Sequence, residues 1–411
     1  MKISKIKLLI FSFLLIANTT FAKDIKISEI VNKAESVMKV VPGQMDLETL
    51  QSISLNDNTD VQISYERLVQ AQKQIAQARA EYFPYGVGTI LGLYFTNAFS
   101  PLILIELVSS LPSKIFTVQK NKHLRTAQKH TLRAVRENIK NQTALIYYSF
   151  LKQEALLKLA QIELNLLKQQ IEVKNEELSL GLATETDVAN SELNFYTLNE
   201  AVLKYKSFYL EERKALNILI GRRMNAKPID LAPARVTDHG FSVVDMSGLE
   251  SMAVERSHEI KAANAMIRAS KSNRRATKWS IISFSGIGFG YISRVKKSQS
   301  QVREAYLRRE LLENTIRTSV YTKISNYKNF VEIYELDSHL YDGTKVMVTG
   351  DINEFSVGQR AKGSVLKSAR LLLKDLRVLV RTNYDALIKQ SDLKRTIPVE
   401  LITNNNVIEL K

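Results

Sequence analysis

The sequence has no cysteine and little glycine or proline. Without a thiol anywhere in its 411 residues, it offers no disulfide, no thiolate metal site and no cysteine for a lipid anchor. Fifteen glycines and seven prolines are few for a chain of this length. Because these two residues are the main breakers of helices, their scarcity predicts long uninterrupted helices.

Recognisable catalytic motifs are also absent. The sequence has no Walker motif, no Gly-x-Ser-x-Gly elbow and no His-Glu-x-x-His, and the glycine-rich run 286–290 lacks the spacing of a dinucleotide site. The histidines show no ligand spacing; they are His123, His130, His239, His258 and His339. We therefore expect no catalytic residue, no cofactor site and no metal site, and a protein that is not an enzyme.

The N-terminus resembles a secretory signal peptide. Lys2, Lys5 and Lys7 precede an apolar stretch from Leu8 to Ile16, and small residues allow cleavage after Ala22. The apolar stretch is too short to span a membrane, although a short buried helix is an alternative. We expect residues 1–22 to direct export.

Positive charge dominates, with a net charge of +16 and a pI near 9.6. In a cytosolic protein this balance would indicate nucleic acid, but an exported chain is not expected to bind it. Lysines alternate with glutamates along predicted helices, for example at Lys168, Glu172 and Lys174. This pattern favours solvated helix faces, with contact to anionic headgroups or acidic partners as the alternative.

The chain repeats itself once. Asn58–Gln62 resembles Ser257–Lys261, and an aromatic or apolar stretch follows the helix that each of them begins. Gly181–Val188 resembles Gly350–Val357, which aligns Gly181 with Gly350. After the signal peptide we therefore predict a first repeat at 23–224, a linker at 225–248 and a second repeat at 249–411.

The longest predicted helix, from about Lys114 to Leu180, carries two apolar rows at spacings of three and four residues. The first row is Leu157, Ala160, Leu164, Leu167, Ile171 and Leu178, and the second is Leu159, Ile162, Leu166, Val173 and Leu180. A two-stranded coiled coil needs one such row, so two rows indicate neighbours on both sides, as in a bundle or a ring of helices.

Two apolar segments interrupt the helices. The segment 85–113 alternates bulky with small or polar residues, which favours a membrane β-hairpin over a transmembrane helix. The segment 279–293 is too short for two spanning strands and fits one strand or a stunted hairpin. Aromatic residues next to these segments fit a membrane interface, or packing at helix ends; they are Tyr82, Phe83, Tyr85 and Trp279.

The order of these features resembles the TolC-like outer-membrane efflux family. Leu180-Gly181-Leu182, followed by Thr186-Asp187-Val188, is similar to the family's periplasmic tip turn. Gly350–Phe355 resembles a second tip turn, with Gly343 as a competing position. The resemblance covers nearly the whole chain after residue 22.

The resemblance implies a mainly α fold of tandem-duplicated long coiled-coil helices with short β-hairpin segments. Three copies would form a trimeric α-barrel and a shared outer-membrane β-barrel. Such a homotrimer lies in outer-membrane lipid and the periplasm, docks onto a periplasmic adaptor protein and an inner-membrane pump, and exports substrates passively. The family pattern has four strands per subunit, whereas this sequence offers two or three.

The resemblance also suggests site residues. Leu180, Gly181, Leu182, Gly350 and Asp351 are candidate adaptor contacts, with ordinary turn packing as the alternative. Asp187 is a candidate for a constriction in the tunnel, or a carboxylate that stabilises a helix N-terminus. The sequence therefore predicts a channel subunit of a tripartite efflux or type I secretion system. The alternative is a non-conducting periplasmic coiled-coil scaffold with a membrane tether.

Overall fold

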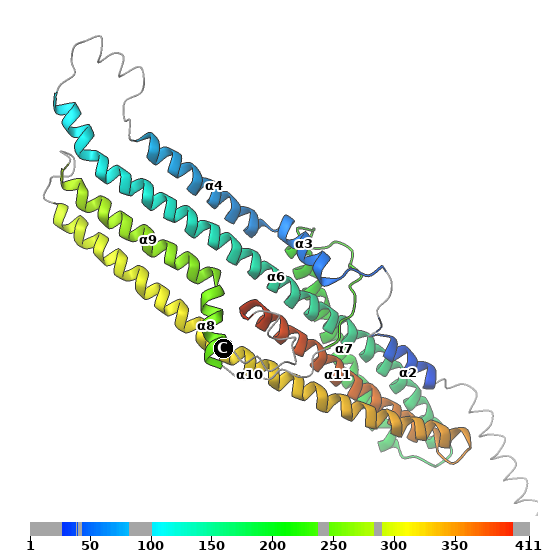
Figure 1. Ribbon diagram of the computed structural model, residues 1–411. Coiled ribbons are helices and arrows are strands. Elements are labelled where there is room, and N and C mark those ends of the chain that lie inside the picture. The colour runs from blue at the N-terminus through cyan, green and yellow to red at the C-terminus, as the bar shows by residue number, and fades with distance from the viewer. Residues whose placement is uncertain are drawn as a thin grey trace, which may run out of the picture. The chain divides into compact units, whose positions relative to one another are not determined.

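A computed structural model describes residues 27–37, 39, 43–81, 101–236, 246–282 and 290–397 (Figure 1). The described chain is almost entirely helical. In order, its elements are α2 (Ile27–Ser36), α3 (Leu47–Asp57), α4 (Thr59–Ala80), α6 (Pro101–Ser179), α7 (Glu185–Leu219), α8 (Met246–Arg256), α9 (His258–Trp279), the single 3₁₀ turn η1 (Ser280–Ile282), α10 (Tyr291–Ser356) and α11 (Lys362–Thr396). The predicted signal peptide lies outside the described residues.

Equal helix lengths reveal the internal duplication. Helices α4 and α9 both have 22 residues, and their N-caps, Asn58 and Ser257, are the residues that the sequence comparison aligned. Helices α7 and α11 both have 35 residues. The sequence offset between α7 and α11 is smaller than the offset between α4 and α9. The second half therefore has a shorter connection somewhere between its two helices.

The chain divides into two compact units, and the first contains residues 1–50, 143–239 and 326–391. In this unit the C-terminal parts of α6 and α10 pack with α7, α11 and α2. Ala160 and Leu167 of α6 form an apolar cluster with Leu198 and Val202 of α7. These are residues of the first apolar row of α6, which therefore faces α7.

The second apolar row of α6 is also covered within the same unit, except for the exposed Leu180 just past the helix end. Leu159 and Leu166 are fully buried, and Val173 lies close to Gly363 at the start of α11. The prediction that α6 has neighbours on both sides is therefore confirmed, and both neighbours belong to the same chain.

The second unit contains residues 51–142, 240–325 and 392–411. Its core includes Val61 of α4 with Leu132 and Ile139 of α6. Hydrogen bonds join neighbouring helices: the Asn121 side chain donates to the backbone carbonyl of Gln74, and the Ser113 hydroxyl donates to that of Ala276. Helices α4, α6 and α9 are thereby held together in one layer of long helices.

The predicted hairpin at 85–113 is wrong over its second half. Residues 101–113 form the first turns of α6, with Pro112 inside the helix. Pro101 suits a helix start, where its missing N–H would be unpaired in any case. The following residues are apolar without clear alternation, and so short an apolar run does not separate strand from helix. Residues 85–100 lie outside the described part of the chain.

The ends of the second apolar segment, 279–293, are also helical. Trp279 ends α9, residues 280–282 form η1, and residues 291–293 belong to α10. Residues 283–289 lie outside the described part. None of the described residues forms a strand, although Met45 and Leu231 make an isolated parallel bridge.

Among the helices of the described residues, no stretch is both long and apolar enough to cross a membrane.

Candidate functional site

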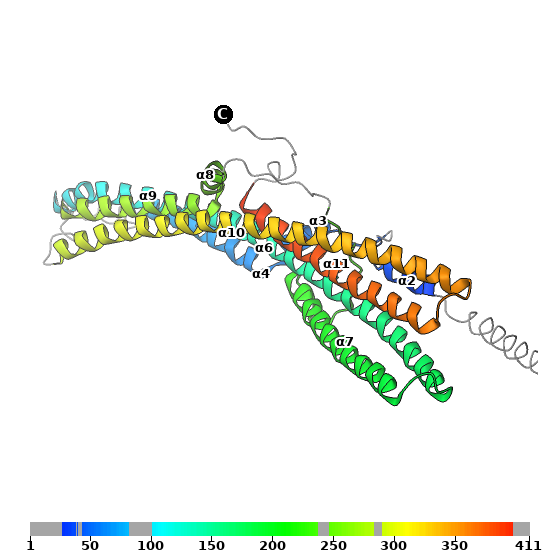
Figure 2. The same cartoon turned by 90° about the horizontal axis from the view of Figure 1, so that it is seen from below.

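Two turns in the first unit, between α6 and α7 and between α10 and α11, form the candidate site (Figure 2). At the first turn, the backbone amide of Gly181 donates to the carbonyl of Leu178 at 3.0 Å. The backbone amide of Leu182 donates to the backbone carbonyl of Glu177 at 2.8 Å. This pair of bonds is a Schellman motif, which needs a left-handed residue after the helix. Gly181 supplies it with φ of 72°.

The first turn exposes two large apolar side chains. Leu180 is 71% exposed and Leu182 is 76% exposed. Neither side chain is buried within the subunit, and an adaptor contact at these two leucines stays a prediction.

Asp187 forms a capping box at the start of α7. Its carboxylate accepts hydrogen bonds from the backbone amide of Thr184 at 3.0 Å and from the Thr184 hydroxyl at 2.7 Å, and the Asp187 amide donates to the same hydroxyl. These bonds, the backbone bond most strongly, lower the pKa of Asp187. The carboxylate is thus ionised and held at a helix N-terminus, where the dipole also favours it.

The predicted second turn near 350 is wrong. Gly343 and Gly350 both lie inside α10, which continues to Ser356. The turn is centred on Gly358, with φ of 75°, and repeats the Schellman bonds of the first turn: Gly358 donates to Phe355 and Gln359 to Glu354. Gly358 therefore corresponds to Gly181, at the same sequence offset that relates α11 to α7.

The misplaced turn has a physical reason. Glycine is tolerated within a helix, and only the conformation at the helix end distinguishes a terminating glycine from an internal one. The sequence after Gly358 has no acidic residue at the spacing of Glu185 from Gly181, whereas Glu354 has that spacing from Gly350, so the segment at Gly350 resembles the first turn more closely.

Asp351 is buried behind the second turn. Only 3% of the residue is exposed, and its carboxylate forms an ion pair with Arg360 and accepts a hydrogen bond from Ser368 in α11. Arg360 also pairs with Glu354 at 2.9 Å. Asp351 therefore holds the turn from inside, and it is not an exposed adaptor contact. Val357, 68% exposed, presents an apolar side chain at this turn instead.

A second buried carboxylate, which the sequence did not reveal, links α6 and α11. Glu163 lies between the apolar rows of α6 and forms ion pairs with Arg377 at 2.9 Å and Arg370 at 3.4 Å. The detectable signal is an acidic residue that lies between the two apolar rows, beside Ala160 and Leu164. Two arginines from one partner helix fix the register of α11 on α6.

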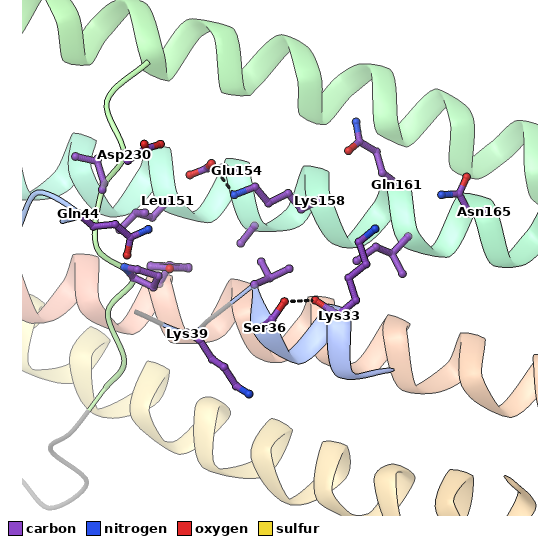
Figure 3. A pocket seen from close by; sticks show the side chains of 16 residues that line it. Lys33, Ser36, Lys39, Gln44, Leu151, Glu154, Lys158, Gln161, Asn165 and Asp230 are labelled. Atoms are coloured by element: carbon purple, nitrogen blue, oxygen red, sulfur yellow. Dashed lines mark hydrogen bonds and ion pairs between the residues drawn. The ribbon is translucent and has the colours of Figure 1, made fainter. Parts of the chain in front are cut away.

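A polar cavity of about 400 Å³ lies where the N-terminal segment meets the inter-repeat linker (Figure 3). Met45 and Ala232 hydrogen-bond across this junction, and the Tyr147 hydroxyl donates to Ala232. Residues 226–236 of the predicted linker 225–248 form no helix and carry the isolated bridge at Leu231, and residues 246–248 begin α8. Lysines and carboxylates both line the cavity, and Lys158 pairs with Glu154 at 2.7 Å, so the lining favours no ligand of one charge.

Two of the histidines meet in the second unit. The rings of His130 and His258 have centroids 5.6 Å apart, and His258 Nε2 lies 3.4 Å from Glu137. Burial lowers the pKa of His130, as do His258 and nearby cations. Sequence spacing could not show this pair, because it joins α6 to α9. No group of three His, Asp or Glu residues in the described part of the chain could hold a metal ion.

Only one of the predicted interface aromatics is described. Trp279, the last residue of α9, is 45% exposed. Tyr82, Phe83 and Tyr85 lie outside the described residues.

No protein-family model matches the sequence, and no curated protein matches it. Solved structures match the fold. A membrane protein from Pseudomonas aeruginosa has a TM-score of 0.66 at 12% identity, covering 87% of this chain and 91% of that chain. The Campylobacter jejuni CmeC outer membrane channel has a TM-score of 0.66 at 11% identity, covering 85% of both chains. The open Neisseria gonorrhoeae MtrE outer membrane channel has a TM-score of 0.65 at 12% identity, covering 85% of this chain and 88% of that chain.

These matches cover most of the chain, including the long helices and the two glycine turns of the first unit. The long helices of the described chain have the fold of outer-membrane channels, as the sequence motifs predicted, and the matched proteins are channels. The predicted β-hairpins and shared β-barrel are not seen among the described residues.

Proposed function

We propose that this protein is the subunit of an outer-membrane efflux channel, a passive conduit formed by three copies. Its fold supports this role, since the proteins that share it include the outer membrane channels CmeC and MtrE. No catalytic function is proposed.

The observation that carries the proposal is a set of uncovered apolar rows in the first unit. Leu193, Tyr196 and Leu203 on α7 follow heptad-like spacing and are all exposed. A second row on α10 consists of Ile333, Leu336, Leu340 and Met347. Extended apolar stripes of this kind mark protein interfaces. Neighbouring copies in a closed ring would cover both rows.

The two turns are the proposed docking points for a periplasmic adaptor that connects to an inner-membrane pump. Leu180, Leu182 and Val357 offer exposed apolar side chains, while Gly181 and Gly358 shape the turns. Asp187 lies in the same region and is exposed, so its carboxylate remains our candidate for a narrow point of the conduit.

Residues 82–100 and 283–289 are the proposed route into the outer membrane. The alternation of residues 85–100 supports strands of a barrel shared by the three copies. Signal-peptide export through residues 1–22 would bring the chain to this location.

A periplasmic scaffold that conducts nothing is the second candidate. Helix α10 begins at Tyr291, only a few residues after η1 ends at Ile282. A spanning strand needs about 9–11 residues, so this connection is short for two strands.

Membrane fractionation followed by mass determination in detergent tests the proposal. A trimer extracted from outer membranes is the expected result. A monomer that carbonate washing releases from the membrane would contradict the channel and favour the scaffold.

A further inference from the structure

Positive charge is concentrated in one part of the second unit. Residues 260–303 contain ten Lys and Arg residues and no Asp or Glu. Residues 107–136 contain seven Lys and Arg residues and likewise no Asp or Glu. By contrast, residues 304–354 contain nine acidic and six basic residues. The alternation of lysines with glutamates suggests an even spread of charge along the helices. The positive charge is instead concentrated in these two segments.

Hydrogen bonds bring these basic segments together at one end of the second unit. The Ser113 hydroxyl donates to the carbonyl of Ala276 at 3.0 Å and joins α6 to α9. The Tyr291 hydroxyl donates to the carbonyl of Lys278 at 3.1 Å and joins α10 to α9. Lys278, on the last turn of α9, is thus close to the first turns of α10, which carry Lys296 and Lys297.

Exposed apolar side chains accompany these lysines. Trp279 and Ile281 follow Lys278, and Ile292 precedes Lys296 and Lys297 on α10. All of these side chains are exposed, Ile292 to 66%. Exposed lysines next to Trp and Ile are typical of surfaces that lie against lipid headgroups, because the cations attract anionic lipid and the apolar groups enter its outer layer.

We propose that this basic-apolar surface, consisting of Lys278, Trp279, Ile281, Ile292, Lys296 and Lys297, binds the anionic phospholipids of the membrane leaflet that faces the helices. The inference rests on the proposed function, which sends residues 82–100 and 283–289 from this end of the second unit into the membrane. Nucleic acid or an acidic protein would complement the charge of the lysines but would leave the isoleucines uncovered. A lipid layer accommodates both the lysines and the isoleucines. The lysines therefore select for anionic lipid around the protein.

Trp279 gives a direct readout, because it is the only tryptophan in the chain. The full-length protein is reconstituted in vesicles that contain brominated phosphatidylglycerol or brominated phosphatidylcholine at equal mole fraction, and quenching of Trp279 fluorescence is compared. The brominated anionic lipid should quench more strongly at low salt, and high salt should reduce the difference.

The test variant is Lys278→Gln/Lys296→Gln/Lys297→Gln. A lysine near an anionic membrane surface contributes about fivefold to association at low salt, so the triple variant should lose at least that much of its preference for phosphatidylglycerol. The control variant, Lys206→Gln/Lys214→Gln/Lys367→Gln, removes the same charge from exposed lysines of α7 and α11 in the first unit and should keep the preference.

The outcomes separate this proposal from the channel itself. Equal quenching by both lipids in the wild-type protein, or an unchanged preference in the test variant, would overturn the lipid surface while leaving the channel standing. Binding only to anionic vesicles, with release at high salt, would support the surface and contradict an embedded channel. The absence of quenching by either lipid would contradict both.

Discussion

Asp351 of α10 forms an ion pair with Arg360, which lies in the turn that follows the same helix. The carboxylate also accepts a hydrogen bond from Ser368 of α11, so one buried group contacts both sides of the turn. A buried carboxylate is stable only with such partners, since its desolvation is otherwise costly. The pair thus stabilises the turn at Gly358 that follows α10.

Replacing Asp351 should destabilise the second turn. We expect Asp351→Ala to lower the free energy of unfolding by about 1–3 kcal/mol, because Ser368 and Arg360 lose a buried charged partner. Chemical unfolding in detergent measures the change. Glu354→Gln is the matched control. It removes the charge of Glu354, the half-exposed second partner of Arg360, and should cost under about 1 kcal/mol. Equal effects of the two changes would contradict the role assigned to Asp351.

Two glycines of α10 and its turn should respond in opposite directions to the same substitution. Gly358→Ala forces a side chain into the left-handed region and should cost about 1–2 kcal/mol. Gly350→Ala should stabilise by about 0.5–1 kcal/mol, because alanine favours the helix interior. A Cβ would meet no atom within 4 Å at either position, so backbone conformation alone decides the sign. Thermal unfolding of both variants checks this, and loss of stability in Gly350→Ala would return the turn to position 350.

The anchoring of α2 should weaken in acid. Burial raises the pKa of Glu35, but hydrogen bonds from Lys345 and Tyr341 outweigh it, and the pKa lies below the ordinary 4.5. A lowered folded-state pKa means that the stabilisation is complete above pH 4.5 and is lost as the pH falls through the folded value.

Hydrogen exchange of α2, corrected for intrinsic rates, measures this loss between neutral pH and pH values below 4.5. Glu35→Gln should expose α2 to exchange already at neutral pH and remove most of the pH dependence. An unchanged pH dependence in Glu35→Gln would assign it to another group.

The apolar row on α7 should control assembly. Leu193→Gln/Leu203→Gln should dissociate the trimer without unfolding the chain, because both side chains are exposed within the subunit. Light scattering in detergent gives the mass, and circular dichroism gives the helix content. Leu182→Gln removes an equally exposed leucine at the tip turn and should leave the trimer intact while weakening adaptor binding. A trimer that survives the double substitution would show that this row is not the interface.

Long-range periodicity predicted the helices well. The two apolar rows of α6 follow from spacing alone, and the structure buries Leu159, Leu166 and Leu167 completely. The duplication was also visible, because capping residues such as Asn58 and Ser257 leave a local signature at a helix start.

Features that depend on contacts between distant segments were not predictable. Local sequence places the second turn at Gly350, because that segment resembles the first turn, whereas the turn forms at the left-handed Gly358 and is held by Asp351, Arg360 and Ser368. The helical start of α6 was missed for a different reason, since a short apolar run has no period of its own. Likewise, no spacing rule pairs Glu163 of α6 with Arg377 of α11, because the two residues lie far apart in the sequence.

Conductance in planar bilayers tests the central claim most directly. The purified full-length protein, inserted as a trimer, should produce uniform, stable conductance steps, and Leu193→Gln/Leu203→Gln should abolish them. Insertion of an intact trimer without any conductance would contradict the channel and identify the protein as a scaffold.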